Sequence, residues 1–108
     1  MHELRMFWNS RQQIQVDLCL QPLIIGAGPD VDLSVQVSGV SRLHCIIYTT
    51  RLSDSDILAG QCDINPIYLL RDLNSTNGTF INGKCLSSDE QLTSGDVIQF
   101  GCATAVFL

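Results

Sequence analysis

Apolar residues in this chain come in short runs that either alternate with polar residues or stop at a turn signal. Residues 14–18, Ile-Gln-Val-Asp-Leu, alternate apolar and polar side chains with the two-residue period of a half-buried strand. The apolar run 23–25 stops at Gly26, and the run 79–81 stops at Asn82–Gly83, a dipeptide typical of two-residue hairpins. This spacing suits strands joined by turns and does not suit long helices.

Further segments of the same character predict an all-β chain. They are apolar, β-branched or aromatic and lie at 4–8, 44–50, 67–70, 97–100 and 103–108. No window of about twelve residues carries an apolar stripe at helical spacing with capping residues at its ends. Many short strands without intervening helices are typical of a sandwich or a barrel. We predict one all-β domain spanning residues 1–108, a length that can bury a real core.

The charge of the chain narrows the class of function. The formal net charge is -5, and charged residues make up 16% of the chain. Because nucleic-acid binding needs a basic surface, we expect no nucleic-acid partner. The chain has neither a secretory signal nor an apolar run of about 20 residues, so we expect a cytoplasmic protein that does not enter membranes. Any anion that it binds must be held in a local pocket, since the overall charge gives no attraction.

The cysteines give no sign of a metal site or a disulfide framework. There are five, widely spaced and without a CxxC pair, namely Cys19, Cys45, Cys62, Cys85 and Cys102. Zinc sites and disulfide frameworks usually show close pairs or an even count. We predict reduced cysteines that pack as small core hydrophobes, and we expect no metal or other cofactor.

The segment 51–65 differs from the rest of the chain because it is polar, acidic and long for a hairpin connection. We predict an exposed loop between two strands. Its aspartates, Asp54, Asp56 and Asp63, lack the sharp-turn glycine and closing glutamate of a calcium loop, so we expect no calcium site there.

Three clusters between predicted strands carry the polar side chains that can bind a ligand. They are Gly26–Leu33, Ser41–His44 and Asp72–Gly83. Ser41 supplies a hydroxyl donor and Arg42 a guanidinium, and both groups suit phosphate oxygens. Asn77 offers a donor and an acceptor to a peptide backbone. His44 follows Arg42 by two residues, so on a strand the two side chains would share a face.

Taken in order, these clusters resemble the forkhead-associated (FHA) family. The matching residues are Gly26, Ser41, Arg42, His44, Asn77, Gly78, Thr79, Asn82 and Gly83. The stretch 92–98, Leu-Thr-Ser-Gly-Asp-Val-Ile, is also similar to the family, and residues 4–18 can supply the opening strands. The resemblance implies an FHA/SMAD-like sandwich of two antiparallel sheets, with about 11 strands and the recognition loops at one end. It also implies a protein-interaction module that binds phosphothreonine-containing proteins or peptides and catalyses nothing.

The resemblance also implies a role for each matching side chain. The phosphopeptide-binding residues would be Ser41, Arg42, Thr76 and Asn77. The residues that shape the loops would be Gly26, His44, Gly78, Asn82 and Gly83. One position departs from the family, because Ala27 stands where the phosphate-binding arginine is expected. A hydrogen bond to a charged group contributes about 1.5–3 kcal/mol, so its loss predicts binding weakened roughly 10- to 100-fold.

Two functions therefore remain open at the level of sequence. The first is phosphothreonine recognition, weakened or disabled by Ala27. The alternative is a phosphate-independent interaction or assembly module, which binds a partner or a second copy of itself through a sandwich with a degenerate pocket. Two origins of Ala27 also remain open: a natural departure from the family, or a substitution in a binding-competent parent. Catalysis is not expected, because His2 and His44 are the sole histidines and the chain has neither GxGxxG nor a P-loop.

Overall fold

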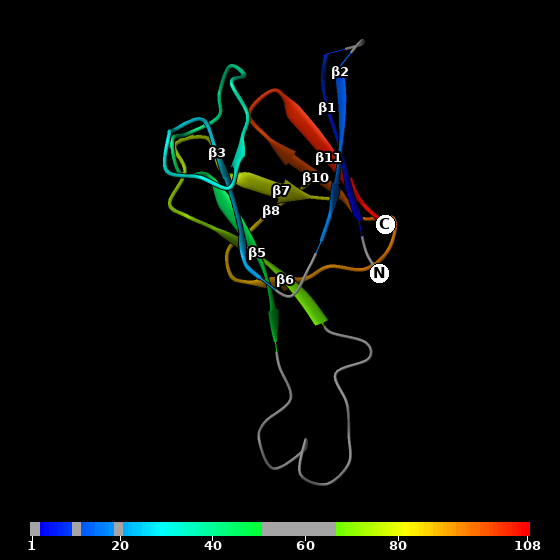
Figure 1. The fold of residues 1–108 in the computed structure, drawn as a ribbon. Helices are drawn as coiled ribbons and strands as arrows, with labels where there is room; N and C mark the ends of the chain where they lie inside the picture. The colour runs from blue at the N-terminus through cyan, green and yellow to red at the C-terminus, as the bar shows by residue number, and fades with distance from the viewer. Residues whose placement is uncertain (1–2, 10–11, 19–20, 51–66) are drawn as a thin grey trace, which may run out of the picture.

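The computed structural model describes residues 3–9, 12–18, 21–50 and 67–108. These residues form eleven strands in two sheets and contain no helix (Figure 1). The strands are β1 (Glu3–Asn9), β2 (Gln12–Asp17), β3 (Leu23–Gly26), β4 (Leu33–Ser34), β5 (Cys45–Thr50), β6 (Ile67–Asp72), β7 (Thr79–Ile81), β8 (Lys84–Cys85), β9 (Glu90–Gln91), β10 (Val97–Phe100) and β11 (Ala103–Phe107). The all-β prediction is confirmed. The predicted loop 51–65 lies outside the described residues.

The two sheets draw strands from distant parts of the chain. The first sheet has the order β2-β1-β11-β10-β7-β8, and the second has the order β4-β3-β5-β6-β9. The described pairs are antiparallel, as predicted, except that β4 runs parallel to β3 with Ile25 opposite Leu33. Three strands were not predicted from the sequence, namely β4, β8 and β9. Each has two residues, which is too short to show a period.

The hairpin between β7 and β8 follows directly from its turn residues. Ile81 pairs with Lys84, so Asn82 and Gly83 form the two-residue loop. Their φ angles are 50° and 84°, and two consecutive positive φ angles give the turn whose twist matches that of a hairpin. The Asn82 side chain also donates to Asp96 Oδ1 (2.9 Å), and its Oδ1 accepts from the Val97 N–H (2.9 Å). The turn is thereby attached to the start of β10.

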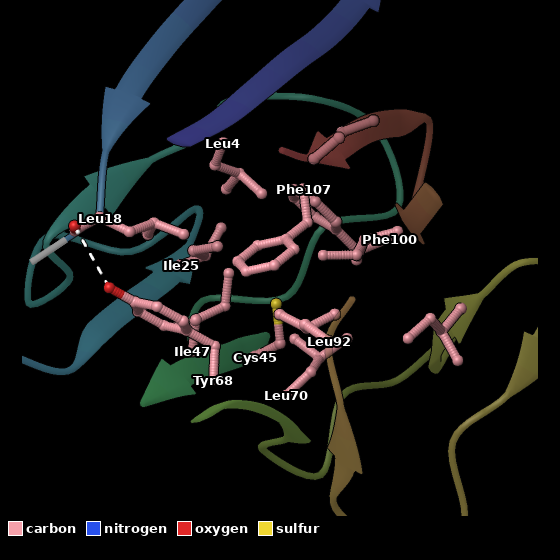
Figure 2. Close-up of a cluster of buried hydrophobic side chains, with 14 of the residues drawn as sticks. Leu4, Leu18, Ile25, Cys45, Ile47, Tyr68, Leu70, Leu92, Phe100 and Phe107 are labelled. Carbon is pink, nitrogen blue, oxygen red and sulfur yellow. Dashed lines mark hydrogen bonds between the residues drawn. The ribbon is translucent and has the colours of Figure 1, made fainter. Parts of the chain in front are cut away.

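Side chains from the inner faces of both sheets fill the core (Figure 2). Leu4, Phe100 and Phe107 come from the first sheet and Ile47 and Leu70 from the second, each with at most 1% of its surface exposed. Burying one such side chain contributes roughly 1.5–3 kcal/mol, so these contacts hold the sheets together and fix the loops at their ends.

A buried tyrosine adds a polar contact to the rim of this core. The Tyr68 hydroxyl donates to the Leu18 carbonyl (3.4 Å), and its ring packs on Phe107 at 5.5 Å between centroids (Figure 2). A buried tyrosine hydroxyl generally needs such a partner.

The prediction that the cysteines pack in the core holds for one of the three described cysteines. Cys45 is fully buried, and burial together with the nearby Asp72 charge raises the pKa of its thiol to about 12. Cys85 and Cys102 are exposed free thiols. They are exposed because Cys85 lies on the edge strand β8 and Cys102 in the turn between β10 and β11. Cys19 and Cys62 lie outside the described residues.

Candidate functional site

Three loops that contain the polar clusters gather at one end of the sandwich (Figure 1). The β3–β4 loop spans residues 27–32, the β4–β5 loop 35–44, and the β6–β7 loop 73–78. Backbone and side-chain hydrogen bonds connect the three loops to one another, as the following contacts show. The predicted binding residues are therefore neighbours in space although 36 positions separate the first, Ser41, from the last, Asn77 (77 − 41 = 36).

The β3–β4 and β4–β5 loops lie against each other through their backbones. The Ala27 N–H donates to the Ser41 carbonyl (2.9 Å), and the Gly28 N–H donates to the Arg42 carbonyl (3.0 Å). A Cβ atom on Gly26 would lie 2.0 Å from the Arg42 carbonyl oxygen. Only glycine allows this close approach, so the place of Gly26 in the sequence is explained by its neighbour across the loops.

A buried histidine connects the β4–β5 loop to the β6–β7 loop. The Ser41 N–H donates to His44 Nδ1 (3.0 Å), and His44 Nε2 lies 2.9 Å from the Gly78 carbonyl. Because Nδ1 accepts, the ring proton is on Nε2, which donates to Gly78. The ring is fully buried and packs on Phe100 at 5.6 Å between centroids. His44 thus holds the two loops at a fixed spacing.

The residues predicted to touch the ligand lie on the exposed side of this connection. Ser41 Oγ accepts from the Thr76 N–H (3.0 Å), which leaves the hydroxyl proton of Ser41 to donate to an anion. Asn77 Nδ2 donates to the Gly39 carbonyl (3.0 Å), which leaves Oδ1 and the second amide hydrogen for a ligand. Gly78 has φ +84°, a conformation that favours glycine and turns the chain into β7.

The prediction that Arg42 and His44 share a face of a strand is wrong. Strand β5 begins at Cys45, so both residues lie in the loop, where the alternation of a strand does not apply. Arg42 is exposed, whereas His44 is fully buried.

Sequence reasoning missed an aspartate that orders the β6–β7 loop. Asp72 accepts from the Ser75 N–H (3.0 Å), from the Ser75 hydroxyl (2.5 Å) and from the Thr79 hydroxyl (2.6 Å). Burial alone would raise the pKa of Asp72, but these hydrogen bonds outweigh it and hold the pKa below its usual value. The signal was present in the sequence, because an aspartate three residues before a serine can form an Asx turn.

The turn between β10 and β11 supports the β4–β5 loop from below, and sequence reasoning missed this contact as well. The Cys102 N–H donates to the Ser38 carbonyl (2.9 Å). A Cβ atom on Gly101 would lie 2.6 Å from the Gly39 carbonyl carbon, so the two glycines pack backbone against backbone. The same Gly39 carbonyl accepts from Asn77, and the turn thereby contributes to the placement of that side chain.

The charges in the three loops are few. Arg42 is their one arginine or lysine, while Asp30 and Asp32 lie in the β3–β4 loop. Asp32 Oδ2 accepts from the Ile24 N–H (2.8 Å) and so helps to close its own loop. Ala27 is half-buried and brings no charge. An anion bound here meets one guanidinium and a set of neutral donors.

No group of three or more acidic, histidine or cysteine side chains that could hold a metal ion occurs within the described ranges. In the same part of the chain, no helix is long and apolar enough to cross a membrane.

Sequence comparison gives the relatives of this chain. The family model of the FHA domain matches residues 23–101. The FHA domain-containing protein FhaA of Mycobacterium tuberculosis (strain ATCC 25618 / H37Rv) is 40% identical over 78 residues, which are 72% of this chain and 12% of that protein. Kanadaptin of Homo sapiens is 35% identical over 80 residues, which are 71% of this chain and 10% of that protein. The chain matches a small part of each of these relatives.

Comparison of structures gives the same family. The crystal structure of the FhaA FHA domain complexed with the intracellular domain of Rv3910 has a TM-score of 0.76 and 29% identity, and the match covers 100% of both chains. A second structure comes from a structural and functional analysis of phosphothreonine-dependent FHA domain interactions. It has a TM-score of 0.71 and 31% identity, and the match covers 98% of this chain and 93% of the other. Strands β1 and β2 precede the residues that the family model matches, and they complete the first sheet.

Proposed function

Because this chain belongs to the FHA family, whose members are protein-interaction modules and not enzymes, we propose that it recognises a phosphothreonine on a partner protein, with an affinity that Ala27 reduces. Two observations on relatives support the proposal. One FHA structure comes from work on phosphothreonine-dependent interactions, and the FHA domain of FhaA was solved with a protein domain bound. The partner proposed for this chain is accordingly a phosphoprotein.

The observation that carries the proposal is the set of contacts made by Ser41. Its carbonyl, its N–H and its Oγ each bind a different segment, namely Ala27, His44 and Thr76. The hydroxyl group is therefore held in place before any ligand arrives. A donor that needs no ordering on binding loses less free energy to entropy, which is the advantage of a preorganised site.

Four side chains have the chemistry for the proposed ligand. The Ser41 hydroxyl and the Arg42 guanidinium would donate to phosphate oxygens, and the exposed Thr76 hydroxyl would add a third donor. Asn77 would pair with the peptide backbone beside the phosphorylated residue. His44 would act only on the protein side, by keeping the loops at the right spacing.

Ala27 sets the expected strength of this site. A phosphothreonine carries a charge of roughly -1.5 to -2 at pH 7, and a single guanidinium leaves part of it unpaired. A missing charge-assisted hydrogen bond corresponds to about 1.5–3 kcal/mol, or roughly 10- to 100-fold in affinity. We therefore expect weak binding by the chain as it stands and a large gain on restoring an arginine.

The test is calorimetric titration of a degenerate phosphothreonine peptide library into this chain and into its Ala27→Arg variant. The backbone accommodates the change, because the Ala27 N–H and carbonyl are both bonded and its φ is not positive. We expect the variant to bind 10- to 100-fold more tightly. Arg42→Gln should abolish the gain, whereas Lys84→Gln, the matched loss of one exposed positive charge on β8, should leave it intact. Equal binding of phosphorylated and unphosphorylated peptides by the variant, or none by either, would contradict the proposal.

A second candidate is a phosphate-independent assembly module, and one surface favours it. An open groove of about 630 Å³ lies on the outer face of the first sheet and is lined by uncharged residues. They include Phe80, Gln99, Cys102 and Thr104. Light scattering over a range of concentrations tests the version in which two copies pair, and a monomer at every concentration would count against it.

A further inference from the structure

A hollow of about 280 Å³ lies beside the phosphate-binding side chains, between the β3–β4 and β4–β5 loops. It is lined by Gly28, Pro29, Asp30, Arg42 and Leu43. The Gly28–Arg42 backbone bond ties the two walls together, and Gly28 has no side chain to fill the space between them. The hollow is therefore a fixed feature of the loop pair. Drug-sized ligands occupy roughly 300–1,000 Å³, so this volume suits a single side chain.

The lining of the hollow is mainly apolar although the loops around it are polar. Leu43 has 48% of its surface exposed, and it is one of two large hydrophobic residues exposed to this degree among the described residues. Pro29 and the aliphatic stem of Arg42 complete the apolar lining. An exposed leucine beside a concave surface is a feature of binding sites, since burial there removes apolar area from water.

The position of the hollow connects it to the peptide site. Arg42 lines the hollow, and the preceding residue Ser41 carries the proposed phosphate donor. An extended peptide advances about 3.3–3.6 Å per residue, so a residue within a few positions of the phosphothreonine reaches the hollow. The Asp30 carboxylate lies in the same lining and repels a negative side chain there.

Building on the phosphothreonine recognition proposed above, we infer that this hollow is a second recognition subsite, which takes an apolar side chain of the partner close to the phosphothreonine and rejects an acidic one. Full burial of such a side chain raises affinity roughly 10- to 100-fold. That gain is as large as the loss caused by Ala27. The partner is thus selected by an apolar residue near the phosphate as much as by the phosphate.

The test is a positional scan with synthetic phosphothreonine peptides. Leucine, serine or aspartate is placed at each of the three positions on either side of the phosphothreonine, and affinities are measured by calorimetry or fluorescence anisotropy. The proteins are this chain and its Ala27→Arg variant, each with and without Leu43→Ser. The Ala27→Arg background ensures that a weak phosphate site does not hide the effect.

We expect one position at which leucine binds about 10- to 100-fold more tightly than serine, with aspartate the weakest of the three. Leu43→Ser should reduce the leucine-to-serine ratio toward one, and Asp30→Asn should relieve the penalty for aspartate. Ile67→Ser is the matched control, because Ile67 has 45% of its surface exposed and lies on β6, away from the hollow. It should leave the ratio unchanged.

Three outcomes overturn the inference, and they differ in what they say of the phosphate site. Phosphopeptides that bind with the same affinity whatever their neighbouring residues would remove the hollow and leave phosphothreonine recognition standing. Leucine peptides that bind equally with and without phosphate would show phosphate-independent docking and overturn both. Absence of binding by every peptide to both backgrounds would also overturn both.

Discussion

Replacing His44 by phenylalanine tests whether this residue holds the recognition loops together through its two ring nitrogens. Phenylalanine keeps an aromatic ring against Phe100 and removes both nitrogens. The Ser41 N–H then loses its acceptor, and the Gly78 carbonyl loses its donor. The substitution therefore separates the hydrogen bonds of the buried ring from its packing.

The expected loss of stability follows from these two groups. A buried donor or acceptor left without a partner costs about 1–3 kcal/mol. Two such groups predict a fall of about 2–5 kcal/mol in the free energy of unfolding. Domains of this size have about 5–15 kcal/mol in total, so the variant should remain folded with a reduced margin.

Urea denaturation at pH 7 measures the overall effect, and amide exchange by NMR locates it. The Ser41 N–H should exchange faster in His44→Phe, because its acceptor has been removed. The Leu73 N–H donates to the His44 backbone carbonyl (2.9 Å), which the substitution retains, so it is an internal control. Leu43→Ser, a change at the exposed neighbouring position, should alter stability by no more than about 0.5 kcal/mol.

Two outcomes would refute this reasoning about His44. A loss below about 1 kcal/mol would mean that the two groups find other partners or water. A large loss with unchanged exchange at Ser41 would mean that the bulk of the new ring, rather than the missing hydrogen bonds, destabilises the domain. Phosphopeptide affinity should fall together with stability, since the same spacing places Ser41 and Thr76.

Two further predictions concern the titration and reactivity of described side chains. The pKa of Asp72 is lowered in the folded state, so its contribution is complete above the model value of 3.8 and is lost as the pH falls through the folded-state pKa. Asp72→Asn should therefore reduce stability at pH 7 and flatten the further loss below about pH 4; parallel urea curves for the two proteins from pH 7 to pH 3 would contradict this. Alkylation of the native protein at pH 8 should modify the exposed thiols of Cys85 and Cys102 and spare Cys45, whose pKa is raised to about 12 by burial and the Asp72 charge. Mass mapping of the peptides reads this out, and early modification of Cys45 would show that the core opens more readily than the structure implies.

The strands that sequence predicted are those whose own residues carry the pattern. Segments such as 14–18 and 97–100 alternate or concentrate apolar residues, and Asn82–Gly83 specifies its turn through backbone conformations that need no other part of the chain. Strands β4, β8 and β9 have no such pattern. They exist because a neighbouring strand offers hydrogen-bonding groups, which is a property of the fold and not of two residues.

The candidate site divides in the same way. Ser41, Arg42, Thr76 and Asn77 could be predicted because hydroxyl, guanidinium and amide groups between strands have few structural uses. Their roles toward a ligand stay predictions. The relation between Arg42 and His44 could not be predicted, since it depends on β5 beginning at Cys45 rather than one residue earlier. A shift of one residue turned an assumed shared face into one exposed and one fully buried side chain.

The contacts that hold the loops in place were beyond sequence reasoning for a physical reason. His44 donates to the carbonyl of Gly78, and Asn77 donates to the carbonyl of Gly39. Every residue has a carbonyl, so a sequence displays the side chain that seeks a partner and hides the backbone atom that serves as one. The same holds for Gly26, whose missing side chain is explained by a carbonyl of Arg42 that lies 16 residues further along the chain (42 − 26 = 16). A loop-rich site of this kind therefore yields its ligand-facing groups to sequence analysis and keeps its supports hidden until the loops are placed in space.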